Sequence, residues 1–369
     1  MHIICHKTDL LNSVNIALRA VSTKTTLPIL ECIVIEAMND TIKLISNNQE
    51  IGIETIVKGN IVTPGSIAIS AKLFSEIIRK LPDNDVVFTT DENNKAFIKC
   101  EKAKFNLSGR SHSEFPTLPE IEKGNPIRIS DFSLKEIIRQ TVFSISDNES
   151  NKIMTGELFE LKGDIFKVVS LDGHRISIRK IQLHDQYDDL SVIVPGKTLN
   201  EISKILSGDV DKMVNIYVTD KHILFSFDNT TVLSRLIEGT YYNINQMLSN
   251  DYVTKVKVNN REFLSCIDRA SLLIKEADKT PIIINITDDN MELKINSTVG
   301  SMKEEIEFSK EGKDIMIGFN PKFLMDALRV IDDEEIEIYL FNPKAPCFIK
   351  DKDENYIYLI LPINFNVGE

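Results

Sequence analysis

The sequence predicts an α+β protein built from three similar domains, each with two helices packed on antiparallel β-strands. Three observations predict this fold. The chain has 369 residues, which is more than one hydrophobic core usually organises. Helical and strand-like hydrophobic patterns alternate along it. A unit of β-run, turn and amphipathic helix recurs at intervals of 125 residues, with equivalent apolar positions at Phe74, Leu199 and Leu324.

The helices are predicted from the 3.6-residue spacing of apolar side chains. In residues 8–21 the apolar positions follow this period, and Asn12, Asn15 and Arg19 lie on the opposite face. The same spacing predicts five more helices, at 72–81, 133–143, 197–206, 261–273 and 322–331. Further strand-then-helix openings begin at His2, Ile127 and Val256, so each third of the chain contains two β-helix-β units.

The segments between the helices predict antiparallel strands. Residues 32–46 and 291–308 carry short alternating runs rich in Ile, Val and Thr, which are typical of hairpins. Prolines and a glycine at 116–126 indicate one domain boundary, and a polar run near residue 250 indicates another. We therefore expect domains at 1–120, 127–248 and 252–369.

Composition excludes several classes of protein. With 42% hydrophobic and 27% charged residues the chain can build ordinary cores, and no stretch approaches the roughly 18 apolar residues of a membrane span. We expect a soluble cytoplasmic protein that does not bind membranes. The cysteines are odd in number and dispersed, which argues against a disulfide framework and a zinc site: Cys5, Cys32, Cys100, Cys266 and Cys347. No metal or other cofactor is expected.

Charge is distributed unevenly between the elements. The net charge of −12 is unfavourable for binding nucleic acid, but the six predicted helices carry +5 and the remainder −17. If the polar helix faces share one surface, that surface attracts phosphates. The alternative is that these are ordinary solvated helix faces.

One stretch, "VVSLDGHRISIRK" at 168–180, gathers Asp172, His174 and Arg175 beside a glycine. An enzyme using Asp172 and His174 for acid–base chemistry is one hypothesis. However, no GxSxG, HExxH or Walker motif accompanies the cluster, and an Asp-Gly pair is typical of a tight turn. We predict no catalytic residue. A third hypothesis is a repeat scaffold unrelated to DNA.

Six short motifs occur in a fixed order along the chain: "TTLPIL" at 25–30, "SLDGHRIS" at 170–177, "VIVPGK" at 192–197, "LIEGTYYN" at 236–243, "IGFNPKFL" at 317–324 and "LPIN" at 361–364. In sequence and spacing they resemble the bacterial DNA polymerase sliding clamps, the β subunits of the replicative polymerase. The resemblance implies the DNA clamp fold, with two chains closing head to tail into a ring of six domains.

The resemblance also implies a function without catalysis. A clamp is an accessory subunit of a DNA-directed DNA polymerase and acts as the processivity factor of that polymerase. The polymerase, and not the clamp, is the nucleotidyltransferase. It encircles duplex DNA without sequence specificity and slides. Its implied partners are the polymerase catalytic subunit, the clamp loader, other polymerases and repair proteins, which bind one hydrophobic groove through short linear motifs.

Matching positions imply the residues of three sites. The groove residues are Met154, Leu171, Gly173, His174, Arg175, Ile176, Tyr242, Met247, Phe323, Lys344, Pro346, Leu361, Pro362 and Ile363. The DNA-contacting residues are Lys24, Lys72, Arg79, Lys80, Asn148, Lys152 and Lys197. The dimer interface sets Lys102, Lys104, Phe105 and Leu107 of one chain against Leu272, Leu273, Glu304 and Glu305 of the other.

Two features depart from the family pattern. After "EG", where many relatives carry a proline and a basic residue, this chain has Tyr242 and Gln246. Its tail continues as "NFNVGE" instead of stopping near an arginine. Both bear on which peptides the groove prefers.

Overall fold

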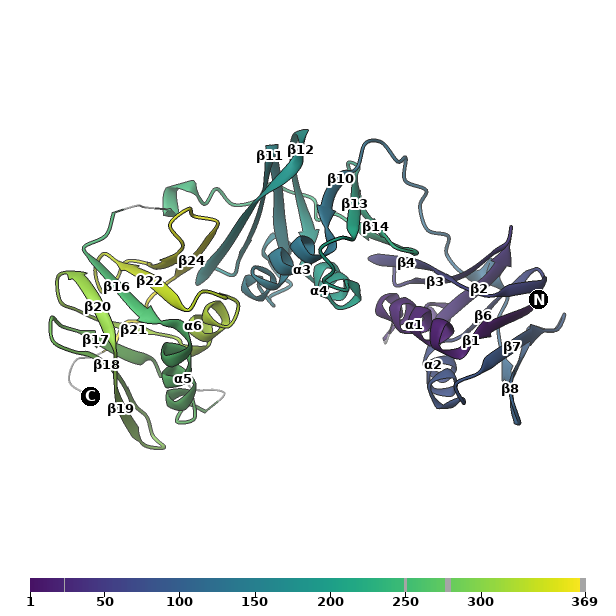
Figure 1. Ribbon diagram of the computed structural model, residues 1–369, viewed down its shortest axis with the longest axis horizontal. Coiled ribbons are helices and arrows are strands. Elements are labelled where there is room, and N and C mark those ends of the chain that lie inside the picture. The colour runs from purple at the N-terminus through teal and green to yellow at the C-terminus, as the bar shows by residue number, and fades with distance from the viewer. Residues whose placement is uncertain (23, 249–250, 276–279, 366–369) are drawn as a thin grey trace. The chain divides into compact units, whose positions relative to one another are not determined.

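The computed structural model describes the chain except residues 23, 249–250, 276–279 and 366–369 (Figure 1). It divides into two compact units, Met1–Lys135 with Asn200–Leu236, and Glu136–Leu199 with Ile237–Glu369. The boundary passes through two helices, α3 (Asp131–Arg139) and α4 (Gly196–Ile205). Every strand pair described is antiparallel, as the sequence predicts for an α+β fold.

The first unit contains two sheets. The larger has the order β10-β13-β14-β15-β4-β3-β2-β6 and the smaller has the order β5-β1-β7-β8-β9. Their strands are β1 His2–His6, β2 Cys32–Met38, β3 Thr41–Asn47, β4 Ile51–Val57, β5 Asn60–Thr63, β6 Gly65–Ser70, β7 Asp85–Thr90, β8 Lys95–Cys100, β9 Ala103–Ser108, β10 Ile127–Ser130, β13 Met213–Val218, β14 His222–Phe227 and β15 Thr230–Arg235.

The second unit also contains two sheets, of order β11-β12-β24-β23-β22-β16-β20 and β19-β18-β17-β21. Their strands are β11 Gly156–Leu171, β12 Arg175–Pro195, β16 Thr254–Asn259, β17 Ile282–Ile286, β18 Met291–Asn296, β19 Ser301–Ile306, β20 Phe308–Gly312, β21 Ile315–Phe319, β22 Glu335–Leu340, β23 Cys347–Lys350 and β24 Tyr356–Ile360. The hairpins predicted at 32–46 and 291–308 are confirmed as β2–β3 and β18–β19.

Both large sheets join strands from different thirds of the chain. In the first unit β4 pairs with β15, and the buried hydroxyls of Thr55 and Thr230 are hydrogen-bonded at 3.0 Å. In the second unit β12 pairs with β24, from Arg175 opposite Ile360 onward. Sheets that continue across the repeats leave fewer edges open to unwanted pairing.

All six predicted helices are present among the described residues: α1 Lys7–Ala17, α2 Ala71–Lys80, α3 Asp131–Arg139, α4 Gly196–Ile205, α5 Asn260–Ser271 and α6 Pro321–Leu328. Two of them begin just after an asparagine that caps the first turn. Asn259 accepts the N–H of Glu262 at 3.0 Å, and Asn320 accepts the N–H of Lys322 at 3.0 Å. None of the helices is long and apolar enough to cross a membrane, as far as the described residues go.

Two predicted helices have the wrong limits. The helix predicted at 8–21 ends at Ala17, and a 3-10 turn follows at Leu18–Ala20. The helix predicted at 133–143 begins at Asp131 and ends at Arg139, and a 3-10 turn follows at Val142–Ser144. The backbone leaves the helical region at Thr141, whose φ is −127°. Val142 and Phe143 therefore continue the apolar spacing without continuing the helix.

The helices of each unit cover its sheets and close its core. Figure 1 shows α1 beside α2 and α5 beside α6, and each pair is in contact. In the first unit Phe74 and Ile78 of α2 are buried against strand residues such as Ile33 and Ile67. In the second unit Phe263 of α5 joins the core. All five cysteines are buried free thiols, and burial raises the pKa of Cys5 and Cys266 to about 12.

Candidate functional site

The segment 171–175 is the tight turn between β11 and β12. One carboxylate oxygen of Asp172, Oδ1, accepts the N–H groups of His174 at 2.9 Å and of Arg175 at 3.1 Å. Gly173 has φ +89°, a left-handed conformation that favours glycine. Asp172 and Gly173 therefore set the backbone, as the sequence predicts for a turn.

Arg175 is buried, with 5% of its surface exposed. Its guanidinium donates from Nε to Asp172 Oδ2 at 2.9 Å, from Nη1 to Asp326 Oδ2 at 2.7 Å and from Nη2 to the carbonyl oxygen of Phe143 at 2.6 Å. It also lies 4.6 Å from the centroid of the Phe323 ring. Charge-assisted bonds to two carboxylates neutralise the cation and hold the turn against α6.

The carboxylate of Asp172 is thus engaged by three donors inside the protein, which favours a structural role over acid–base chemistry. His174 contributes its ring to a stack on Phe323, with centroids 5.9 Å apart and planes 20° apart. Its carbonyl oxygen accepts the N–H of Leu361 at 2.9 Å. Farther along the tail, Ile363 donates its N–H to Gly318 of β21 at 2.8 Å.

An apolar cluster lies directly beside this turn. Leu171 and Ile176 are each 5% exposed and belong to a core group with Leu158, Val169, Ile178, Ile244, Phe348, Ile357 and Leu359. The partly buried side chains packed against it are Met154, Tyr241, Leu248 and Tyr339. Segments far apart in the sequence therefore supply one continuous apolar surface.

Three large apolar side chains of the predicted groove remain exposed. Tyr242 is 41%, Met247 55% and Leu361 36% exposed. Pro362 and Ile363 are half-buried, and Lys344 and the half-buried Pro346 lie in the connection between β22 and β23, just before Phe348. Exposed apolar groups beside a formed apolar surface are typical of a binding site.

Several residues that shape this site are not among those predicted from the sequence. Phe143 and Asp326 hold Arg175, and Asn151 donates from Nδ2 to the hydroxyl of Tyr242 at 2.7 Å. Tyr241 donates its hydroxyl to the carbonyl oxygen of Val169 at 3.2 Å. Tyr241 stands inside the quoted "LIEGTYYN" motif, but nothing local in the sequence marks the other three.

A buried carboxyl group lies next to Tyr241. Glu157 of β11 is fully buried, and neither of its carboxyl oxygens has a hydrogen-bond partner in the described structure. The neighbouring hydroxyl of Thr141 donates instead to the carbonyl oxygen of Ile137 at 2.7 Å. Burial raises the pKa of Glu157 well above its ordinary value. Burial, and secondarily Glu157, also raises the pKa of Tyr241.

The predicted DNA-contacting residues are all exposed. Lys24 lies between the 3-10 turns Leu18–Ala20 and Pro28–Glu31, whereas Lys72, Arg79 and Lys80 lie on α2. In the second unit Asn148 lies in the loop that leads into the 3-10 turn Lys152–Thr155, and Lys152 begins that turn. Lys197 of α4 pairs with Glu149 at 2.8 Å.

Many helix cations carry an acidic partner, as Arg139 does with Glu136 and Asp332. Within the described part of the chain six helix cations show no ion pair: Lys7, Lys72, Arg79, Lys80, Lys135 and Arg261. Three of these six lie on α2, and each of the other three lies on a different helix.

The predicted interface residues lie on or beside two strands that end their sheets. β9 carries Phe105, which is 37% exposed, and β19 carries Glu304 and Glu305. Leu272, just after α5, is 80% exposed. Glu304 already pairs with Arg269, with one contact of 3.0 Å.

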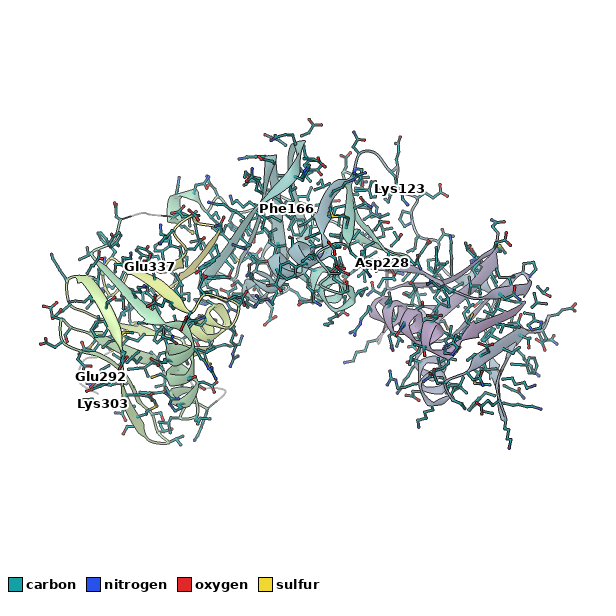
Figure 2. The ribbon with its side chains drawn as sticks, viewed as in Figure 1. Lys123, Phe166, Asp228, Glu292, Lys303 and Glu337 are labelled. Atoms are coloured by element: carbon teal, nitrogen blue, oxygen red, sulfur yellow. The ribbon has the colours of Figure 1, made fainter. Side chains whose placement is uncertain are left out.

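The edge strand β19 is also tied to its neighbour by charge. Lys303 of β19 pairs with the buried carboxylate of Glu292 on β18, and Figure 2 shows the two residues close together. Lys294 pairs with the same carboxylate. The other acidic side chain of β19, Glu305, accepts a hydrogen bond from Nδ2 of Asn290 at 3.3 Å.

Three protein-family models together match nearly the whole length of the chain. They describe the DNA polymerase III beta subunit: its N-terminal domain matches residues 1–119, its central domain 128–243 and its C-terminal domain 245–364. The beta sliding clamp of Staphylococcus epidermidis is 36% identical over 364 residues, covering 96% of each chain.

Solved structures agree with these matches. A putative DNA polymerase III beta subunit from Eubacterium rectale has 61% sequence identity and a TM-score of 0.96, covering 99% of this chain and 100% of that one. The DNA polymerase sliding clamp of Bacillus subtilis has 34% identity and a TM-score of 0.95 over the same shares.

Proposed function

The chain belongs to the family of bacterial DNA polymerase III beta subunits, the sliding clamps, and from this premise we propose that it is the processivity factor of a replicative DNA polymerase. The observation that carries the proposal is the match of all three beta-subunit domains, in order, along one chain. The hypothesis of a scaffold unrelated to DNA was motivated by the acidic net charge alone. The match to three domains of a DNA polymerase subunit favours the clamp instead.

In this proposal two chains close head to tail into a ring around duplex DNA. Two open sheet edges support it, since β9 and β19 each end a sheet and an exposed edge is a liability unless something pairs with it. Charge supports the pairing of these edges, because Lys104 lies on β9 and Lys102 just before it, while Glu304 and Glu305 lie on β19. The exposure of Leu272 also supports an interface there.

Phosphate contacts hold the ring loosely on DNA. The exposed cations Lys24, Lys72, Arg79 and Lys80 of the first unit, and Lys152 and Lys197 of the second, are proposed to face the backbone. Such contacts carry no sequence information and weaken with salt, which suits a protein that slides. A replication factor of this kind is expected to work in the cytoplasm.

Polymerases, the clamp loader and repair proteins are proposed to bind the apolar surface around Leu171, Ile176 and Phe323 through short linear peptides. The formed apolar cluster and the exposed Tyr242, Met247 and Leu361 support this, because extended peptides gain affinity from a few apolar anchors in a prepared surface. The protein itself is proposed to perform no chemistry, since Asp172 is committed to its turn and to Arg175.

The experiment that tests the function is topological. The purified protein, loaded by a clamp loader onto nicked circular DNA, is expected to co-elute with the circle on gel filtration and to be lost once the circle is cut to a linear form. A matched sample loaded directly on linear DNA is the control. Equal retention on circular and linear DNA would contradict a sliding ring.

A further inference from the structure

An exposed aromatic ring lies at the rim of the apolar surface. Tyr242, which directly follows the cluster's partly buried neighbour Tyr241, is 41% exposed. An exposed tyrosine ordinarily samples several side-chain conformations, and ordering it on binding costs free energy. Tyr242 is instead held at two points.

The first point is the tip of the ring. The hydroxyl of Tyr242 accepts a hydrogen bond from Asn151 Nδ2 at 2.7 Å, across 91 residues of sequence. The second point is its flank, where the ring of Tyr241 makes an edge-to-face contact with centroids 6.3 Å apart. Tyr241 is itself fixed, because it packs against the apolar cluster and donates to Val169.

Asn151 is fixed by its own backbone. Its N–H donates to the carbonyl oxygen of Asn148 at 3.2 Å, and its carbonyl oxygen accepts the N–H of Met154 at 3.1 Å. Met154 packs against the apolar cluster, and its carbonyl oxygen accepts the N–H of Ser146 at 2.8 Å, which closes the loop. The donor that reaches Tyr242 therefore comes from a rigid support.

The two segments also lie close together along their backbones. Gly239 has φ +137°, and a Cβ at this position would lie 3.0 Å from Ile153 Cδ1. The positive φ favours glycine at this position, and the segment that carries Tyr242 lies in contact with Ile153, two residues from Asn151. The position of Tyr242 is thus set by three independent features of the fold.

We propose that Asn151 is a positioning residue that holds the ring of Tyr242 as a preformed wall of the peptide-binding groove. This inference rests on the proposed function. A fixed aromatic wall binds an extended apolar peptide without first having to be ordered, so the Asn151–Tyr242 pair contributes affinity although Asn151 need not touch the peptide.

A double-mutant cycle tests the proposal. The full chain and the variants Asn151→Ala, Tyr242→Phe and the double variant are titrated into a fluorescein-labelled peptide from the clamp-binding segment of a replicative polymerase catalytic subunit. Each single variant is expected to bind about three- to ten-fold more weakly, which is the range of one hydrogen bond. The double variant is expected to bind no more weakly than the singles, because both remove the same interaction.

Two further variants separate positioning from a general loss of structure. Asn151→Asp is expected to restore nearly full affinity, because the hydroxyl of Tyr242 can donate to the new carboxylate. Ser150→Ala, an exposed neighbour in the same loop whose side chain makes no hydrogen bond in the described structure, is expected to bind as the unmodified chain does.

The outcomes are distinct. Unchanged affinity for both Asn151→Ala and Tyr242→Phe would overturn the positioning role while leaving the groove in place. Additive losses would overturn it too, because the two residues would then act separately. An unmodified chain that does not bind the peptide at all would instead overturn the proposed groove, and the inference with it.

Discussion

Arg175 and Asp326 form an ion pair at 2.7 Å across 151 residues of sequence, with side chains only 5% and 18% exposed. The pair ties the turn at the end of β11 to α6, the helix that also carries Phe323. Since Asp172 binds the same guanidinium, removing the cation leaves two shielded carboxylates without their partner.

Replacing Arg175 by methionine is therefore expected to destabilise the protein by about 3 kcal/mol, the usual cost of an uncompensated buried charge. Urea unfolding followed by circular dichroism measures the change, and peptide affinity should fall with it because the stack of His174 on Phe323 loses its support. The matched control is Lys322→Met, which removes a 68% exposed cation 3.6 Å from the same Asp326 and is expected to cost less than about 1 kcal/mol. Equal costs for the two variants would contradict the role given to Arg175.

Glu157 makes stability depend on pH. Its pKa in the folded chain lies above the ordinary value of 4.5, so above pH 4.5 the unfolded chain releases this proton while the folded chain retains it. The contribution of this proton to the free energy of unfolding is therefore present at low pH. It is lost as pH rises, at about 1.4 kcal/mol per pH unit, until Glu157 ionises in the folded chain.

Glu157→Gln removes the titration and keeps the shape of the side chain, so its free energy of unfolding should exceed that of the unmodified chain by an amount that grows from pH 5 to pH 8. Glu157→Met also removes the unpartnered polar atoms, and should be more stable than Glu157→Gln at every pH. Denaturant titrations at several pH values measure both differences. A constant difference across this range would show that Glu157 is already ionised in the folded state.

The sequence was sufficient for the local elements and for much of the site. The apolar spacing located all six helices, and the Asp-Gly pair located the turn at Asp172, because both depend on interactions within a few residues. The misplaced limits of α3 arose because Val142 and Phe143 continue the helical spacing inside a 3-10 turn. The partners of Arg175 and Tyr242 lie 151 and 91 residues away, and spacing holds no information on such contacts.

Gly173 is expected to be required for its backbone conformation and not for space. Its φ is +89°, and no atom lies within 4 Å of the position of a Cβ, so Gly173→Ala should cost about 1–2 kcal/mol through strain alone. Gly124→Ala is the matched control, because a Cβ there also meets nothing within 4 Å and its φ lies outside the left-handed region. It is expected to be neutral or slightly stabilising. Thermal unfolding of both variants measures the difference. Equal changes in stability for Gly173→Ala and Gly124→Ala would show that the positive φ of Gly173 is not what requires glycine there.

The tail is expected to serve the groove and not the dimer interface. Ending the chain at Ile360 removes the hydrogen bonds of Leu361 to His174 and of Ile363 to Gly318, together with the exposed Leu361 side chain. Peptide affinity should fall by about ten-fold or more, while the oligomeric state in solution stays the same. Peptide titration and light scattering on the same sample check both statements, and unaltered peptide affinity would remove the tail from the site.

Leu272 is expected to belong to the subunit interface, because a leucine that is 80% exposed in the single chain gains most from being covered. Leu272→Asp should raise the dissociation constant of the dimer at least about ten-fold, or about 1.4 kcal/mol, because a carboxylate would have to be buried beside apolar side chains. Folding of the chain itself should be unaffected, since the side chain makes little contact within it. Val210→Asp is the control, at a position 62% exposed that no proposed interface includes. Sedimentation equilibrium measures both variants, and a dimer that survives Leu272→Asp unchanged would place the subunit contact elsewhere.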